Sequence, residues 1–555
     1  MLEKAIDDRR LEARRVVDPW VDRSIRWANA LLAANAHFLD GAVVPMPCPA
    51  EYNFFFTHDV LLTDLAAISF DPTRVRRDLS YIADHARDSV IPHAYYWKDD
   101  GFKTEYCPPD DWNHLWFVLA AGTYLRHTLD TAFSARLYPI TKKSMAQALL
   151  RLKSDHLMHA LAPDWWDIGK HEGSRAYMTI LIIRAIREYL FVSSFLGKDS
   201  PELLTYEHLA DEAQTALGTK LWDQQSAYLT NYNGSIRDTH YYMGSLLAPV
   251  FHLLDLDRSR LLVRTAEREL LARDIGIRTV MPPDFNTDSM LTFFHFAGNE
   301  ACDPYLYANG GVWAHSNAWY TLALRATGRV DDAYNFFRTA MTLDGVAHSP
   351  MGQPAMYEYR YSDPKSPRYG WIDKPTFLWA AGFTLLTAYQ LVGIDDNEWN
   401  ISFSGDLPLA WDSVACSLEF FGAKHIRRVR QPKGFQQLTV DGALVPSVVV
   451  PVDVASSSSW VLQSVGRVVP QLESINAILR AVAISKDAKK LTIVASSFTG
   501  HVVSASINSQ KRPLSVTVNG KPVKTFSVSH AKNGSFRTLV RYTASEPTQG
   551  MTIRF

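Results

Sequence analysis

Helical periodicity over the first two thirds of the chain constrains its fold more than any other feature. Between about residues 19 and 393, apolar residues recur at the spacing that gathers them on one face of an α-helix. The pattern predicts twelve helices in successive pairs. They are expected near 19–38, 58–69, 73–88, 112–128, 131–153, 174–196, 203–217, 238–253, 258–272, 315–327, 329–342 and 375–392.

The links between these helices alternate in length. Within pairs they are short, as in FDPT (70–73) and ATGRVDD (326–332), and between pairs they are long, aromatic and rich in Pro and Gly. This alternation places the long loops on one face, where function is expected. Six helical hairpins that close into a ring form an (α/α)6 barrel with these loops at its mouth. A linear helical solenoid is the alternative, although no fixed repeat period is visible.

Beyond about residue 400 the apolar pattern changes to a period of two. Segments such as LTIVASSF and HVVSASIN alternate in this way, and Asn519-Gly520 and Asn533-Gly534 are strong hairpin signals. The fold class is therefore mainly α, an (α/α)6 barrel followed by a C-terminal all-β sandwich. We expect a linker and first helix over 1–40, the catalytic barrel over 41–395 and the β-sandwich domain over 396–555.

Composition excludes several classes of function. Apolar residues make up 47% of the 555 residues, charged residues 21%, and the net charge is −1. This balance is typical of a soluble globular protein and provides no basic field for nucleic acid or an anionic membrane. The N-terminal MLEKAIDDRRLEARR lacks the apolar core of a signal peptide. We expect a cytoplasmic protein, or a periplasmic or secreted one if a leader has been removed.

Cysteine and histidine spacing indicates neither a disulfide framework nor a metal motif. The four cysteines show no CxxC spacing. His93, His114, His171 and His240 are scattered, and a structural role is the better interpretation of each. We therefore expect no metal and no cofactor.

Aromatic residues crowd the predicted loops, as in YYW (95–97), DDW (110–112) and YEYRY (357–361). Aromatic loops often line a binding surface, and packing in the core of a large domain is the alternative. Trp112, Trp313 and Trp371 are the candidate platforms on which a sugar ring could stack.

The stretch DWWD (164–167) places Asp164 and Asp167 on either side of Trp165 and Trp166. Carboxylates beside indole rings are costly unless they have a partner or a task. Cleaving an acetal needs a proton for the leaving oxygen, and the indoles would raise the pKa of Asp167 and keep it protonated. Asp167 is therefore the candidate general acid. Capping of the helix near 174 is the alternative, but the gap is long for a cap.

Glu358 is the candidate general base, in a loop that also offers Tyr357 and Arg360. In an inverting glycosidase the two carboxyl groups lie about 6.5–9.5 Å apart, which leaves room for the attacking water. A surface ion pair between Glu358 and Arg360 is the alternative. Other candidate sugar-binding residues are Asp59, Asp111, His315 and Asn317. Asp59 and Asp111 lie at helix starts, where a carboxylate also stabilises the helix.

Five segments, in the same order, resemble the (α/α)6 glycoside hydrolases and phosphorylases. They are FFFTHDVLLTDL (54–65), CPPDDWNHLW (107–116), APDWWDIGKHEGS (162–174), NGGVWAHSNAWY (309–320) and the loop from GQPAMYEYRY (352–361) to FLWAAGF (377–383). The third resembles the Asp-Trp-Asn-Asp motif of the cellobiose and chitobiose phosphorylase family, and the last also resembles a glucoamylase loop. The resemblance covers about residues 45–395.

This resemblance implies that Asp167 is the general acid, that the loop of Glu358 carries the base, and that Asp59 holds a terminal sugar. It also implies that His315 and Asn317 bind sugar hydroxyls or phosphate. The chain departs from the family at three places. His58 replaces an Arg, Trp166 replaces an Asn, and FLWAAGF lacks the hydroxyls of a phosphate-holding Thr-Gly-Thr stretch.

These features predict an inverting glycoside hydrolase that acts on oligosaccharides or polysaccharide chain ends. An inverting phosphorylase is one alternative, and a non-catalytic carbohydrate-binding or scaffold protein is another. The expected partner is a carbohydrate substrate, without nucleic acid or membrane, and the sequence leaves a homodimer open. The residues expected to contact substrate are His58, Asp59, Asp111, Trp112, Asp164, Trp165, Trp166, Trp313, His315, Asn317, Tyr357 and Trp371.

Overall fold

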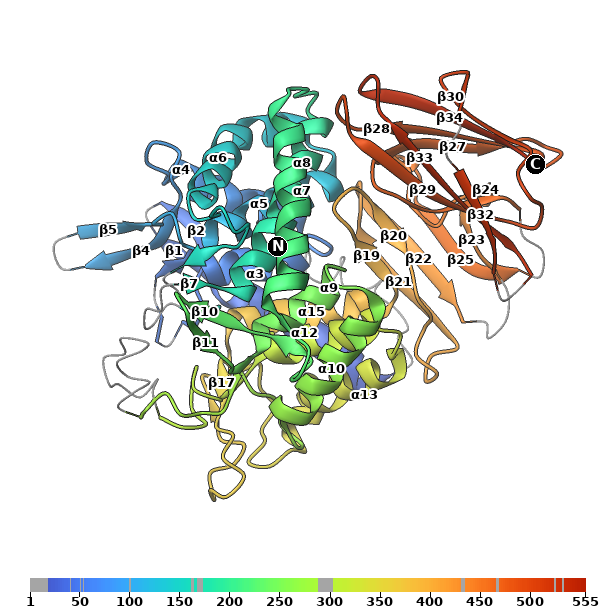
Figure 1. Cartoon of the computed structure of the whole chain (residues 1–555). Coiled ribbons are helices and arrows are strands. Elements are labelled where there is room, and N and C mark those ends of the chain that lie inside the picture. Colours follow the sequence, from blue (N-terminus) through green and yellow to red (C-terminus); the bar gives the residue numbers. More distant parts are fainter. Residues whose placement is uncertain are drawn as a thin grey trace.

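The computed structural model of the chain contains a helical part followed by a β part, which lie side by side (Figure 1). It describes residues 18–555 except 40, 50, 53, 99–100, 161–163, 167–172, 288–302, 431–434, 466–468, 524–525 and 532–533. Within these residues, no helix combines the length and apolar character needed to cross a bilayer.

Each of the twelve segments predicted from periodicity contains a helix. The bounds are α2 (Pro19–Ala34), α3 (Thr57–Ala67), α4 (Pro72–Asp84), α5 (Asn113–Thr128), α6 (Thr131–Leu149), α7 (Ala176–Phe195), α8 (Glu202–Ala216), α9 (Leu247–Val250), α10 (Leu256–Leu270), α12 (Ala314–Ala326), α13 (Val330–Ala340) and α15 (Leu378–Leu391). The main correction is at 238–253, where strand β12 (Tyr241–Tyr242) and the 3₁₀ turn η2 (Met243–Leu246) replace most of the expected helix.

Two kinds of helix alternate along the chain. In α5 and α7 nearly every residue is buried, whereas α4, α10 and α13 bury one stripe and expose the rest. The buried helices contact one another in the order α3, α5, α7, η2–α9, α12, α15 and back to α3. The amphipathic helices pack outside them. This arrangement explains the two types of apolar pattern, because a helix that is covered on all sides needs no polar face.

Helix starts also differ along the chain. The amphipathic helices α4, α6 and α10 are capped by the side chains of Asp71, Asp130 and Asp255. The N-cap residues of the buried helices α3, α7 and α15 make no such side-chain bond. The buried helices α12 and α5 do receive such bonds, since the Trp313 N–H donates to the Ser316 hydroxyl and the Asn113 N–H donates to Asp111.

Short strands arise in the loops that precede the buried helices. Strands β4 (Pro92–Lys98) and β5 (Gly101–Tyr106) form a hairpin that projects from the helical part (Figure 1). Strands β16 (Val312–Trp313), β17 (Tyr359–Arg360) and β18 (Ile372–Asp373) form one antiparallel sheet. This sheet pairs Trp313 with Tyr359, and Tyr359 with Asp373, across a long sequence distance.

The remainder of the chain forms the predicted all-β region. It begins with the β19–β20 hairpin (Ile394–Asp396 and Ile401–Phe403), and three larger sheets follow it. Their strands are β21 (Ser413–Glu419), β22 (Ala423–Val429), β23 (Phe435–Val440), β24 (Ala443–Val445), β25 (Ser459–Val465), β26 (Gln471–Ile475), β27 (Ile478–Ile484), β28 (Lys490–Ser496), β29 (Val502–Ser509), β30 (Ser515–Val518), β31 (Lys521–Pro522), β32 (Phe526–His530), β33 (Phe536–Thr543) and β34 (Thr548–Arg554).

Two of these sheets share one apolar core, as a sandwich requires. Side chains of the sheet β26-β29-β33-β32, such as Ile507 and Val540, pack in the same cluster as Ile493 and Ile553 of the sheet β27-β28-β34-β30-β31. The predicted turn at Asn519-Gly520 joins β30 to β31 with both residues at positive φ. The predicted turn at Asn533-Gly534 includes a residue outside the described part.

A network of buried charges joins the C-terminal ends of α5 and α7 to the start of the β region. Arg126 donates to both carboxylate oxygens of Glu188 at 2.9 and 2.8 Å, and Arg184 pairs with the same carboxylate. Arg184 also lies 3.6 Å from Glu398, just after β19. A Cβ on Gly122 would lie 2.4 Å from Glu188 Oε2, so only glycine leaves room for this carboxylate.

Candidate active site

The N-terminal ends of the buried helices bring together a cluster of aromatic and histidine side chains. His58 (α3) lies 5.4 Å from Trp112, which precedes α5, and 6.1 Å from His315 (α12), measured between ring centroids. His315 in turn lies 4.9 Å from Trp165 and 4.3 Å from Trp379 (α15). None of these side chains is more than 5% exposed. We call His58, Trp112, Trp165, Trp313, His315 and Trp379 the aromatic cluster.

Strand pairing between β16 and β17 extends this cluster toward Glu358. Trp313 lies 4.4 Å from Trp165 and stacks on Tyr359 at 5.7 Å. Its indole Nε1 donates to the carbonyl oxygen of Tyr307. Trp166 packs against Tyr242 at 5.8 Å between ring centroids. Of the two tryptophans of DWWD, Trp165 therefore contacts the histidine and tryptophan rings of the aromatic cluster, and Trp166 contacts Tyr242.

The two histidines of the cluster are neutral and have unused hydrogen-bonding atoms. Burial lowers the pKa of His58 to about 3, and burial together with His58 lowers the pKa of His315 well below its usual value. Within the part of the chain that the structure describes, neither ring nitrogen of His315 nor Nε2 of His58 has a hydrogen-bond partner. Leaving buried polar atoms unpaired costs about 1–3 kcal/mol each, so these atoms are suited to a ligand's hydroxyl groups.

Glu358 is buried beside a lysine and not at the surface. Its Oε2 lies 2.6 Å from Lys374 Nζ, and only 1% of the residue is exposed. Burial raises the pKa of Glu358 to about 7, although the charge of Lys374 opposes this. Lys374 Nζ also lies 5.7 Å from the ring of Tyr359, which connects Glu358 to the aromatic cluster. Arg360 instead donates to the carbonyls of Gly370 and Pro350, so it is not the partner of Glu358.

Asp164 is a buried acid packed against the backbone of η2. Burial raises its pKa to about 8, despite the opposing charge of Arg175 and a bond from the Gly244 backbone. A Cβ on Gly244 would lie 2.5 Å from Asp164 Oδ1, which shows how closely the two approach. Asp167, the candidate general acid, lies outside the described residues.

Two of the predicted sugar-binding residues hydrogen-bond to the protein itself. Asn317 accepts from the backbone N–H of Ile277 at 2.9 Å and donates to the hydroxyl of Tyr357 at 3.0 Å. Asp59 is buried in the first turn of α3. Trp371 is partly exposed, with the guanidinium of Arg368 5.1 Å above its ring.

His240 has the structural surroundings that were expected for it. Its Nδ1 lies 2.7 Å from Asp238 and its Nε2 lies 2.8 Å from Asp284. Burial lowers the pKa of His240, but the two carboxylates raise it to about 9. His171 lies outside the described residues.

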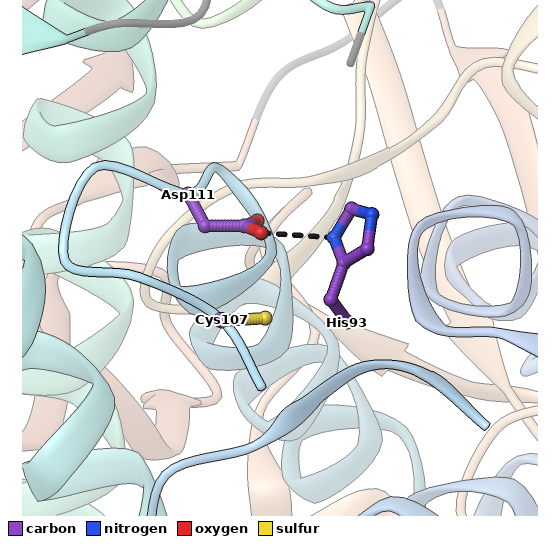
Figure 2. Close-up of side chains that lie close together, drawn as sticks. All are labelled: His93, Cys107 and Asp111. Carbon is purple, nitrogen blue, oxygen red and sulfur yellow. Dashed lines mark hydrogen bonds and ion pairs between the residues drawn. The ribbon is translucent and has the colours of Figure 1, made fainter. Parts of the chain in front are cut away.

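One further group, which no spacing in the sequence indicates, adjoins Trp112. Asp111 Oδ2 lies 2.9 Å from His93 Nδ1, and Cys107 lies next to both (Figure 2). Asp111 Oδ1 accepts from the backbone N–H of Asn113 at the start of α5. Burial raises the pKa of Asp111, but its bond to His93 and the charge of that ring hold it below its usual value.

Comparison with known proteins agrees with the motifs in the sequence. The chain is 22% identical over 420 residues to the N,N'-diacetylchitobiose phosphorylase of Vibrio proteolyticus, an alignment that covers 69% of this chain and 50% of the relative. It is 21% identical over 373 residues to the Vibrio furnissii enzyme of the same name, covering 60% and 45%. The chain thus spans about half the length of these curated relatives. It is related to the superfamily of glycoside hydrolases and phosphorylases, while no protein-family profile matches it.

Solved structures with some likeness to the chain include glycoside hydrolases. A rhamnosidase from Klebsiella oxytoca with rhamnose bound aligns with a TM-score of 0.46 and 18% identity, over 68% of this chain and 64% of the other. A GH63 mannosylglycerate hydrolase from Thermus thermophilus, in complex with Tris and D-glycerate, aligns with a TM-score of 0.49 and 14% identity, over 65% and 99%.

Proposed function

We propose that the chain is an enzyme that cleaves glycosidic bonds at the mouth of an (α/α)6 barrel. The observation that carries this proposal is the aromatic cluster, in which indole faces and unpaired neutral imidazoles meet at the starts of the buried helices. Indole faces stack on sugar rings, and a neutral imidazole offers one donor and one acceptor for hydroxyl groups. The closed order of contacts between the buried helices supports the barrel.

The reaction we propose is hydrolysis with inversion. Asp167 protonates the leaving oxygen, while Glu358 takes a proton from the water that attacks the opposite face of the sugar. A base works best when its pKa is near the working pH, and burial brings the pKa of Glu358 to about 7. The carboxylate form of Glu358 is populated as the pH rises through that value. Cleavage should therefore increase with pH over the same range.

The substrate, in this proposal, is an oligosaccharide or a polysaccharide chain end. Trp112, Trp165 and Trp313 provide stacking faces, and His58 and His315 bind hydroxyl groups. Asp59 and Asp164 complete the binding residues near them, while Asn317 and Tyr357 position the loop of Glu358 through their mutual hydrogen bond.

Phosphorolysis is the second candidate, and two observations favour it. The curated relatives are named as phosphorylases, and the ammonium group of Lys374 lies 2.6 Å from Glu358. A phosphate near Lys374 would be attracted by the positive charge of its ammonium group but repelled by the carboxylate of Glu358. A non-catalytic carbohydrate-binding role is the third candidate, and its support is His58, which stands where the related family has an Arg.

The experiment that separates these candidates compares wild type with Glu358→Gln across a phosphate titration. The substrates are gluco-oligosaccharides and N,N'-diacetylchitobiose, and the products are free sugar and sugar 1-phosphate. Glu51→Gln is the matched control, because Glu51 lies 3.5 Å from the same Lys374 but is about half exposed. We expect phosphate-independent cleavage that falls by on the order of 10²–10⁴-fold in Glu358→Gln and stays near wild type in Glu51→Gln.

Three other results would contradict the proposal in different ways. Sugar 1-phosphate release that depends on phosphate and survives in Glu358→Gln would establish a phosphorylase. Unchanged hydrolysis in Glu358→Gln would remove Glu358 from the reaction. Binding of the sugars without cleavage of any of them by wild type would leave only the non-catalytic role.

A further inference from the structure

Three potential metal ligands of different chemistry meet beside the start of α5. His93 lies in β4, Cys107 directly follows β5, and Asp111 precedes α5. Their ligand atoms, an imidazole nitrogen, a thiol sulfur and a carboxylate oxygen, all lie within 4.8 Å of one another. Figure 2 shows the three side chains close together, with a dashed line between Asp111 and His93 and the sulfur of Cys107 to one side of that line.

The separation of the nitrogen and oxygen ligands is close to that in a zinc site. Zinc binds histidine nitrogen at about 2.0–2.1 Å and carboxylate oxygen at about 2.0–2.2 Å, so two such ligands in a tetrahedral site lie roughly 3.3 Å apart. His93 Nδ1 and Asp111 Oδ2 are 2.9 Å apart and need to separate by only a few tenths of an ångström. Asp111 Oδ1 is fixed by the Asn113 N–H at 2.7 Å, which leaves Oδ2 turned toward His93.

The mixture of ligand types determines which ions fit. Mg²⁺ and Ca²⁺ prefer sites made of oxygen alone, whereas a combination of thiolate, imidazole and carboxylate suits Zn²⁺. Three protein ligands leave a fourth position for water. Cys107 and Asp111 are 5% and 6% exposed, so an ion here would be held within the protein and not at its surface.

We propose that His93, Cys107 and Asp111 bind one Zn²⁺ ion. The ion replaces the hydrogen bond between His93 and Asp111, and the thiol of Cys107 loses its proton to solvent as the thiolate binds. Bound in this way, the ion fastens both ends of the β4–β5 hairpin to the start of α5. It also fixes Trp112, whose ring lies 6.4 Å from His93 and 5.4 Å from His58 of the aromatic cluster.

This role goes beyond the proposed function and gives Asp111 a different task. An Asp111 that binds zinc is not free to bind a sugar hydroxyl, which is the role expected for it from the sequence. The ion is a positioning element for Trp112, and the residues proposed for catalysis, Asp167 and Glu358, are not among its ligands. Metal binding can therefore be tested without any substrate.

The test uses the full chain, stripped with a chelator, dialysed and titrated with Co²⁺ and with Zn²⁺. Cobalt bound to a thiolate has a ligand-to-metal charge-transfer band in the near ultraviolet, which reports on Cys107 directly. We expect this band at one ion per chain in wild type, displaced by Zn²⁺. In Cys107→Ser the band should vanish, and Zn²⁺ affinity should fall on the order of 100-fold or more, because even losing a residue that supports a ligand costs 10–100-fold.

Cys48→Ser is the matched control, because Cys48 is equally buried but lies outside the group. It should keep both the band and the affinity. Wild type that shows no thiolate band, or binds no ion after dialysis, overturns the proposal without reference to any variant. A band that persists in folded Cys107→Ser, or one that disappears in folded Cys48→Ser, does the same.

Discussion

The two ends of the buried helices differ in how their buried polar groups are paired. At the C-terminal ends of α5 and α7, each buried carboxylate faces a cation, as Glu188 faces Arg126 and Arg184. At the N-terminal ends of the same ring, the buried imidazoles of His58 and His315 keep nitrogens that no described residue satisfies. One end is arranged to hold the fold together. The other end accepts a cost in stability, which is the usual condition of a binding site.

A single helix demonstrates the contrast. Helix α5 begins beside Trp112 of the aromatic cluster and ends with Arg126 and His127, which bind Glu188 and Asp396 in the charge network. Both ends are buried, so burial alone does not tell a site from a scaffold. What distinguishes them is that the main polar groups of the C-terminal end pair as ions, whereas the neutral imidazoles of His58 and His315 keep nitrogens that no described residue satisfies.

The largest effect is expected from Asp167→Asn, which tests whether the DWWD motif supplies the general acid. The change keeps the shape of the side chain but removes its proton. Turnover of a natural glycoside should fall by on the order of 10²–10⁴-fold. Substrates with good leaving groups should recover part of this loss, because they need less protonation. Initial rates on both substrate types measure it, and near-normal turnover of the natural glycoside would exclude Asp167 as the acid.

The next largest effect is expected from Glu188→Gln at the opposite end. Removing this charge leaves Arg126 and Arg184 buried without their principal partner, which should cost about 3–5 kcal/mol of the free energy of unfolding. Urea denaturation measures the loss. The control is Glu202→Gln, whose partly exposed pair with Lys142 should contribute about 0–1 kcal/mol. Equal losses in the two variants would show that the buried network contributes no more to the free energy of unfolding than an exposed ion pair does.

Asp164→Asn tests the cost of burying an acid next to the site. The pKa of Asp164 is raised from 3.8 to about 8, so between these values the folded state binds the proton more tightly than the unfolded state. Stability should therefore fall as the pH rises through this window, by about 1.4 kcal/mol per pH unit from this group. Denaturation of both proteins at pH 5, 6 and 7 should show this slope in the difference between wild type and Asp164→Asn, because other shifted groups such as Glu358 contribute equally to both. An unchanged slope would mean that Asp164 is ionised in the folded protein.

The smallest effect on stability is expected from His315→Phe, which can be compared directly with the same substitution at the other end of the buried helices. Phe keeps the ring contact with Trp379 and removes two unpaired nitrogens, so the protein should be unchanged or more stable by about 1 kcal/mol. Sugar binding should weaken at the same time, as a higher KM. His127→Phe makes the same change at the other end, where it removes the bond to Asp396 at 2.8 Å and should be destabilising. If thermal denaturation ranks the two variants in the reverse order, the distinction between the ends fails.

Periodicity predicted the helices well because it reports directly on which face is buried. Helix α5 was expected over 112–128 and spans Asn113–Thr128. The exception is 238–253, where β12 and η2 take most of the segment. Gly244 of η2 lies against Asp164, and a contact between residues so far apart in the chain has no signature in the local pattern.

The site could be predicted only in part. The residues of DDW and DWWD were expected to face a ligand because their loops were expected on one face. In the structure Trp112 packs against His58, His58 against His315, and His315 against Trp165. Trp379 was missed because its segment reads as the interior of a helix. The group at His93 and Cys107 was missed because a β-hairpin, and not sequence spacing, brings its members together.

The shared direction of the buried helices has an electrostatic consequence. Each helix carries a macrodipole equivalent to roughly +0.5 elementary charge at its N-terminus, and five helices of 11–20 residues begin around the aromatic cluster. Their summed field makes this end positive although its histidines are neutral. An oxocarbenium-like centre would be destabilised there unless carboxylates such as Glu358 offset the field. An anion in contact with these helix starts would be stabilised by them.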